Sequence, residues 1–195
     1  MPNLVEVDKN LKYYKITQLN TQYRNGKQFN ENVVAVSEKE VNLDAKDNTE
    51  IGGFCISDYK HIFRWVIRGN YLCEVQIPDD TKIYKAESEN GIYVSNKIIL
   101  VNPIKMSDEV AMKLYLSSEL PEISYIRAMA ACCIQGYVKT AEKVFQDKIN
   151  KNNCELAFFE FESFCKRREE EYKIKVFEIE HIKLFLNKIK NYDNH

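Results

Sequence analysis

Glycine and proline are scarce in this chain, with 6 and 4 copies among 195 residues. This scarcity argues against a loop-rich fold and against a repetitive fibrous architecture. Hydrophobic residues supply 45% of the chain and aromatic residues 12%. That content is enough to bury a large core, so we do not expect wholesale disorder. The length fits one large domain or two small ones.

An excess of either charge is also missing. The 28 basic residues nearly balance the 29 acidic ones, which leaves a formal net charge of −1. No global basic field is therefore available to hold a phosphate backbone, and we do not expect general nucleic-acid binding.

The densest local charge run is KRREEEYK, at residues 166–173. We interpret it as a solvated helix face whose oppositely charged side chains pair four residues apart. The expected pairs are Lys166–Glu170 and Arg167–Glu171. Contact of the basic residues with RNA or with an acidic partner is the alternative interpretation.

Long apolar runs and a secretory leader are missing as well. No apolar run reaches the length needed to cross a bilayer, so we expect no membrane partner. The residues after Met1 show no basic start followed by an apolar segment, so we expect no signal peptide. We therefore expect a cytoplasmic protein.

Cysteine pairs with zinc-binding spacing are absent. The six cysteines are Cys55, Cys73, Cys132, Cys133, Cys154 and Cys165. None belongs to a CxxC pair, so we expect no metal site. We expect reduced thiols, most of them small core residues.

Residues 11–101 contain short runs of β-favouring residues separated by turns. Residues 11–17 form one such run, and residues 71–77 alternate with a period of two. We expect residues 1–102 to form an α+β head domain, with a small mixed or antiparallel sheet and one short helix.

Helical spacing replaces this pattern in residues 103–195. Ser107 and Pro121 are typical first residues of helices. Two further helical segments are expected at 154–172 and 177–189. We expect this tail to be an antiparallel helical unit.

The segment GGFCISDYKHIFRWV, at residues 52–66, predicts a strand-to-helix corner. Its two glycines predict a turn that side chains would obstruct. Residues 54–56 predict a buried strand, and Ser57 or Asp58 can cap the helix that follows. The apolar residues expected to bind this helix to the sheet are Phe63, Trp65 and Val66.

Several of these segments resemble the N-terminal domain of giant-virus ankyrin-repeat proteins. They are YYKIT (13–17), NG (25–26), GGFCISDYKHIFRWV (52–66), GNYLCEVQIPDD (69–80) and NKIIL (96–100). The resemblance covers about residues 11–101 and supplies no activity for the domain. It implies a viral or mobile-element protein that acts on host or defence machinery.

Residues 130–149, AACCIQGYVKTAEKVFQDKI, resemble the centre of an ankyrin repeat. Gly136 would let two antiparallel helices turn tightly, and Ala130 and Ala131 would let them approach closely. The T-P-L-H start of that repeat is missing, and 156–189 is at best a degenerate second copy. Two ordinary packed helices are an equal alternative.

Ankyrin-like units bind proteins, so the resemblance implies a protein-interaction module with another protein as its partner. No enzyme activity and no cofactor are expected under this hypothesis. The residues expected to contact the partner are Tyr137, Lys139, Lys166, Arg167 and Arg168.

A fainter resemblance to ADP-ribosyltransferase folds implies an alternative function, an NAD-binding enzyme or an inactive relative of one. Lys15 stands where that family has a histidine, and Ser57 matches its second motif, so both would bind the cofactor. The family's catalytic glutamate has no clear match, because Glu87 and Glu89 lie several residues early, in a turn. Without it, cofactor binding could persist while catalysis would not.

No other catalytic constellation is visible. His61, His181 and His195 are the only histidines. His61 fits a surface or hydrogen-bonded structural residue better than a catalytic base. Cys55 has no partner that a motif would identify as its base, and no P-loop, GxGxxG, HExxH or EF-hand pattern occurs.

Overall fold

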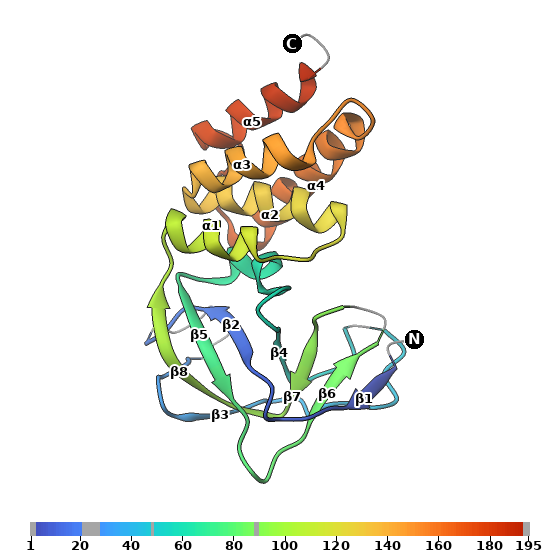
Figure 1. The fold of residues 1–195 in the computed structure, drawn as a ribbon, viewed down its shortest axis with the longest axis vertical. Coiled ribbons are helices and arrows are strands. Elements are labelled where there is room, and N and C mark those ends of the chain that lie inside the picture. The colour runs from blue at the N-terminus through green and yellow to red at the C-terminus, as the bar shows by residue number, and fades with distance from the viewer. Residues whose placement is uncertain (1–2, 21–27, 48, 88–89, 193–195) are drawn as a thin grey trace. The chain divides into compact units, whose positions relative to one another are not determined.

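The structure, a computed structural model, describes residues 3–20, 28–47, 49–87 and 90–192 (Figure 1). The chain forms two compact units. The strand unit comprises residues 1–62 and 68–106, and the helical unit comprises residues 63–67 and 107–195. The expected α+β class is confirmed. The turn expected at Asn25-Gly26 lies outside the described residues.

Two four-stranded antiparallel sheets make up the strand unit. The first sheet has the order β1-β6-β7-β4 and the second has the order β2-β5-β8-β3. The strands of the first sheet are β1 (Leu4–Glu6), β6 (Ile83–Ala86), β7 (Tyr93–Ser95) and β4 (Phe54–Ile56). The strands of the second are β2 (Tyr13–Thr17), β5 (Tyr71–Gln76), β8 (Lys97–Lys105) and β3 (Val34–Val36).

A shared apolar core holds the two sheets together. Its buried residues from the second sheet are Tyr13, Cys73, Val75, Ile98 and Leu100. Those from the first sheet are Phe54, Ile56, Ile83 and Tyr93. Since neighbouring residues of a strand face opposite sides, Cys55 points away from this core and is exposed. The strand at 54–56 is therefore buried on one side only, which corrects the expectation of a wholly buried strand.

The polar segment between β3 and β4 is anchored at its centre and near β4. Ala45 and Ile51 are buried with Val94 of β7 in a second, smaller apolar cluster. Side chains within the segment also accept backbone hydrogen bonds, as Asp47 does from the N–H of Thr49 at 2.7 Å. Such turns let a hydrophilic stretch fold back on itself without a sheet partner.

Five α-helices and the larger part of a 3₁₀ helix form the helical unit. The α-helices are α1 (Asp108–Leu116), α2 (Glu122–Gln135), α3 (Val138–Lys148), α4 (Cys154–Tyr172) and α5 (Glu180–Lys190). The 3₁₀ helix is η1 (Ile62–Arg68), and a second short one, η2 (Val176–Glu178), precedes α5. The last helix expected from the sequence is thus divided into η2 and α5.

The helix starts at Ser107 and Pro121 are confirmed. The Ser107 hydroxyl accepts a hydrogen bond from the N–H of Val110, and Pro121 directly precedes α2. At the end of α2, Gly136 adopts a left-handed conformation with φ of 80°, and the N–H of Tyr137 donates to the carbonyl of Cys132. This is the turn that lets α3 fold back along α2.

The two hairpins α2–α3 and α4–α5 stack so that α2 and α4 run in the same direction. Glu122, at the start of α2, accepts from Asn153, just before α4, and Arg127 pairs with Glu160 at 2.8 Å. Buried residues recur along the two helices with an offset of 32 residues. The matching pairs are Tyr125 with Ala157, Met129 with Phe161, and Cys133 with Cys165.

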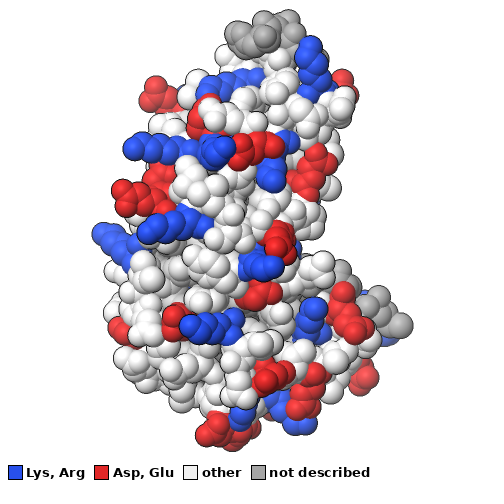
Figure 2. Space-filling model, in the orientation of Figure 1, with Lys and Arg blue, Asp and Glu red and all other residues white. Residues whose placement is uncertain are grey.

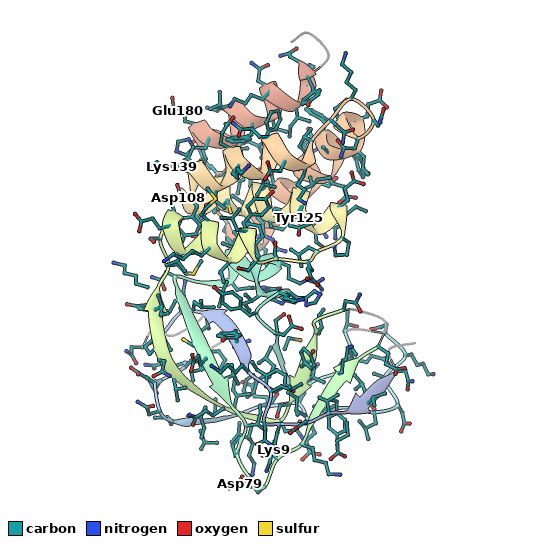
Figure 3. All side chains as sticks on the ribbon, viewed as in Figure 1. Lys9, Asp79, Asp108, Tyr125, Lys139 and Glu180 are labelled. Atoms are coloured by element: carbon teal, nitrogen blue, oxygen red, sulfur yellow. The ribbon has the colours of Figure 1, made fainter. Side chains whose placement is uncertain are left out.

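Asp108 ties α1 to the start of α3 (Figure 3). Its carboxylate accepts hydrogen bonds from the backbone N–H groups of Lys139 and Thr140, each at 2.9 Å, and from the Thr140 hydroxyl at 2.6 Å. The first N–H groups of a helix have no partner within the helix, and a negative charge there is favourable. A side chain from another helix thus supplies the cap that α3 lacks in its own sequence.

Candidate functional site

The corner at residues 52–66 begins with two glycines in a left-handed conformation, with φ of 70° at Gly52 and 65° at Gly53. A Cβ atom on Gly52 would lie 2.1 Å from the carbonyl oxygen of Glu40, and one on Gly53 would lie 2.7 Å from the Val41 side chain. Their predicted role, a turn that side chains would obstruct, is confirmed.

Ser57 does not cap the following helix. It is fully buried, its backbone pairs with that of Tyr14, and its hydroxyl donates to the carbonyl of Gly91 at 2.5 Å. Asp58 instead accepts from the N–H of His61 and closes a turn ahead of η1. The expected cap at Ser57 is therefore wrong. Asp58 does accept a backbone hydrogen bond, but in the turn that precedes η1, which is a 3₁₀ helix and not the expected α-helix.

The residues predicted to bind the corner helix to the sheet, at positions 63–66, are grouped with the helical unit. Residues 63–67 belong to the helical unit, where the ring of Phe63 lies 5.6 Å from that of Tyr115. Phe63 and Val66 are buried as expected, whereas Trp65 is half-buried. The periodicity thus correctly identified the buried residues Phe63 and Val66, and contact of this helix with the sheet stays a prediction.

Asp58 and His61 form a hydrogen-bonded pair in the strand unit. Nδ1 of His61 lies 2.7 Å from one carboxylate oxygen of Asp58, and the Tyr93 hydroxyl donates to the other at 3.2 Å. The ring of His61 also fills the space over Gly91, where any Cβ would meet it. His61 is therefore a hydrogen-bonded structural residue, as expected.

The Asp58 partner of His61 was missed at the sequence level. The available signal was the spacing, since an aspartate three residues before a histidine at a turn can reach its ring. Chemically, the carboxylate orients the imidazole and leaves Nε2 as the ring nitrogen that could act on another group. Among the residues that the structure describes, no nucleophilic side chain is hydrogen-bonded to His61, so the Asp58–His61 pair does not form a complete catalytic set.

Buried phenols and thiols predict that the strand unit loses stability at alkaline pH. Burial raises the pKa of Tyr13 to about 12, and burial followed by the charge of Glu31 raises the pKa of Cys73 to about 11. Groups whose pKa is higher in the folded protein stabilise it fully below their unfolded pKa and lose that contribution as the pH rises through the folded value. The unfolded values lie near 8.5 for cysteine and 10 for tyrosine.

We therefore expect the free energy of unfolding to fall steadily from about pH 9 to about pH 12. Urea unfolding at a series of pH values measures this directly. The Tyr13→Phe variant, which lacks the phenol, should show a shallower decline. A free energy that stays flat across the window would contradict the burial of these groups.

Lys15 and Ser57, the residues of the NAD alternative, lie on adjoining segments. Tyr14, next to Lys15, forms a β-bridge with Ser57. The Lys15 ammonium donates to the carbonyl of Cys55 at 2.9 Å, and the Ser57 hydroxyl is buried against Gly91. Both polar groups are thus used within the unit, and Glu89 lies outside the described residues. NAD binding stays a prediction without a supporting observation.

The residues expected to contact a partner through α3 differ in exposure. Tyr137 is buried, and burial raises the pKa of its phenol. It therefore packs inside the helical unit and offers little surface to a partner. Lys139 is exposed, and its backbone N–H is held by Asp108.

The charge run on α4 pairs differently from the expected pattern. Lys166 binds Glu162, one turn earlier, at 2.7 Å, and Arg168 pairs with Glu171. The guanidinium of Arg168 also lies over the Phe164 ring, 4.8 Å from its centre, so this side chain is mostly buried. The expected Lys166–Glu170 and Arg167–Glu171 pairs are wrong. Lys166 and Arg167 are exposed, with the Arg167 Nε donating to the Ser163 carbonyl.

A small apolar surface on α2 and α4 was not expected. It consists of Ile123, Leu156 and Phe159, with exposed fractions of 37%, 40% and 63%. Ile123 lies one turn before Arg127, and Leu156 lies one turn before Glu160. Arg127 and Glu160 pair between the two parallel helices, and Leu156 and Phe159, three residues apart, are surface neighbours on α4. We call Ile123, Leu156 and Phe159 the apolar patch.

Charge does not single out a surface on the face drawn in Figure 2. Basic and acidic side chains alternate over the face shown in Figure 2, with no extended area of one sign. Within the described ranges, no group of three or more potential ligand side chains is arranged to hold a metal ion. Nor does any described helix combine the length and apolarity needed to span a membrane.

Comparison of the chain with protein-family models, with curated proteins and with solved structures gives no match. The geometry of the two units is therefore the ground for a functional proposal.

Proposed function

We propose that the protein is a protein-interaction module that binds its partner through the helical unit. The observation that carries this proposal is the apolar patch, in which an aromatic side chain, Phe159, is 63% exposed on a well-packed helix. Large exposed apolar groups that lie together mark interaction surfaces more often than isolated ones do.

The patch has the chemistry of a binding hot spot. Phe159 would supply the aromatic anchor, and Leu156 and Ile123 would supply apolar contacts beside it. The Arg127–Glu160 ion pair one turn further along would form part of a polar rim. Aromatic anchors surrounded by residues that exclude water dominate the binding energy of many interfaces.

The resemblances extend the proposal to the kind of partner. The stacked α2–α3 and α4–α5 hairpins support an ankyrin-like unit, although the structure describes only two such pairs. Together with the resemblance to giant-virus proteins, this leads us to propose a host or defence protein as the partner. The six free thiols suit a reducing compartment, and we propose the cytoplasm.

The test is capture of a partner by the tagged full chain and by two matched variants. Phe159→Ser removes the anchor of the patch, and Leu184→Ser makes a similar change on α5, where Leu184 is 45% exposed outside the patch. We expect the wild type and Leu184→Ser to retain one stoichiometric protein after nuclease treatment. Phe159→Ser should lose it, with at least about a thirtyfold rise in Kd, as for a hot-spot residue worth about 2 kcal/mol.

Circular dichroism of the variants separates a binding defect from unfolding. Both substitutions replace exposed side chains, so both variants should melt close to the wild type. Equal retention of the partner by all three proteins would overturn the assignment of the patch.

A further inference from the structure

A cavity of about 600 Å³ opens in the strand unit, between the segment that enters β2 and the end of β5. Backbone pairing between these strands stops at Tyr13 and Val75. Within the described residues no backbone pairing between the two segments continues beyond that pair, and the Lys9 ammonium contacts Asp79. It donates to the Asp79 carbonyl at 3.1 Å and lies 3.2 Å from its carboxylate (Figure 3). The cavity is therefore a slot between these two segments, with a solvent-exposed ion pair at one end.

The walls of this slot carry opposite charges on one face of the sheet. Glu74 and Gln76 line the slot from β5, two residues apart on the same side of that strand, and Lys12 lines it from the segment that enters β2. Ile99 pairs with Gln76 and adds an apolar surface to the lining. Lys12 lies two residues before Tyr14, the residue that pairs with Glu74, so both charged side chains border the same cavity.

Lys12 and Glu74 are more available to a ligand than Lys9 and Asp79 are. Lys9 and Asp79 already neutralise each other. Among the residues that the structure describes, Lys12 forms no ion pair or side-chain hydrogen bond, and Glu74 accepts one from Asn102 at 2.9 Å. The slot consequently offers one cationic and one anionic group to a ligand, beside an aliphatic surface.

We propose that this slot binds a dipeptide-sized zwitterion, with its carboxylate on Lys12 and its ammonium group on Glu74. An extended dipeptide separates its termini by about 5–7 Å, a span that two long charged side chains on the lining of one cavity can bridge. The volume lies in the range of small-molecule sites. A nucleotide or other polyanion is disfavoured because Glu74 and Asp79 would face its phosphates.

The test is an amide-resolved NMR titration of the full chain with the dipeptide Ala-Leu as the probe. We expect shifts in residues 9–13 and 74–79, with a Kd between about 10 μM and about 1 mM. The capped analogue N-acetyl-Ala-Leu-amide, which lacks both charges, should bind at least about tenfold more weakly. Lys12→Gln and Glu74→Gln should each weaken binding of Ala-Leu by about tenfold or more.

Lys105→Gln is the matched control, because Lys105 is an exposed lysine of the same sheet outside the slot. Its affinity for Ala-Leu should equal that of the wild type. Three results would overturn the proposal: no shifts at about 10 mM probe, equal shifts with the capped analogue, or unchanged affinity in both slot variants. Because the slot and the apolar patch lie in different units, this outcome is independent of partner capture.

Discussion

Replacing Gly52 with alanine is expected to destabilise the strand unit by about 3 kcal/mol or more. Two costs combine at this position. A left-handed backbone costs about 1–2 kcal/mol for a residue with a Cβ atom. That atom would also lie 2.1 Å from the carbonyl oxygen of Glu40, a backbone atom that cannot rotate aside. Urea unfolding followed by far-ultraviolet circular dichroism measures the loss.

Gly136 provides the control for this prediction. It has a similar φ, 80°, but a Cβ atom there would meet nothing within 4 Å. Gly136→Ala therefore carries only the conformational cost, about 1 kcal/mol. The loss in Gly52→Ala should exceed it by about 2 kcal/mol or more. Equal losses would mean that the chain near Glu40 moves aside and that the corner is not fixed by close approach.

Much of the fold could be predicted because local chemistry determines it. Alternation at 71–77 predicts β5, the hydroxyl of Ser107 predicts the start of α1, and Gly136 predicts the turn into α3. Each of these signals acts within a few residues of its effect. The range expected for the long helix, 154–172, coincides with α4 for the same reason.

The partner of an apolar face is a tertiary property and could not be predicted in this way. Phe63 and Val66 were correctly expected to be buried, but the spacing says nothing about which unit buries them. Asp108 shows the same limit, because the helix start that it caps lies about 30 residues further along the chain. Such contacts emerge only when the elements are packed.

The candidate site was less predictable than the fold. Charge and aromatic character suggested Arg168 and Tyr137 as contact residues, yet both are largely withdrawn from solvent. The reason is that long amphipathic side chains can bury their bodies while satisfying their polar ends. Phe159 shows the opposite error. An aromatic residue next to the buried positions of a helix is easily assigned to the core, yet this ring is exposed.

The second large effect is expected at Phe161, which is fully buried on α4, the helix that packs against α2. Phe161→Ala should destabilise the helical unit by about 3–5 kcal/mol, because it removes buried apolar surface and leaves a cavity. Chemical denaturation followed by circular dichroism reports the change. The same substitution two residues earlier, Phe159→Ala, should change stability by less than about 0.5 kcal/mol, because that ring is largely in solvent.

This pair of variants also tests the surface proposed for partner binding. Residues two apart on a helix point in directions about 200° apart, so a helix that buries Phe161 must turn Phe159 outward. A large loss in both variants would mean that Phe159 also packs against protein, and the apolar patch would then be core rather than surface. If only Phe161→Ala loses much stability, Phe159 is available to a partner. Its ring then contributes little to folding, and its exposed apolar area can be buried on binding.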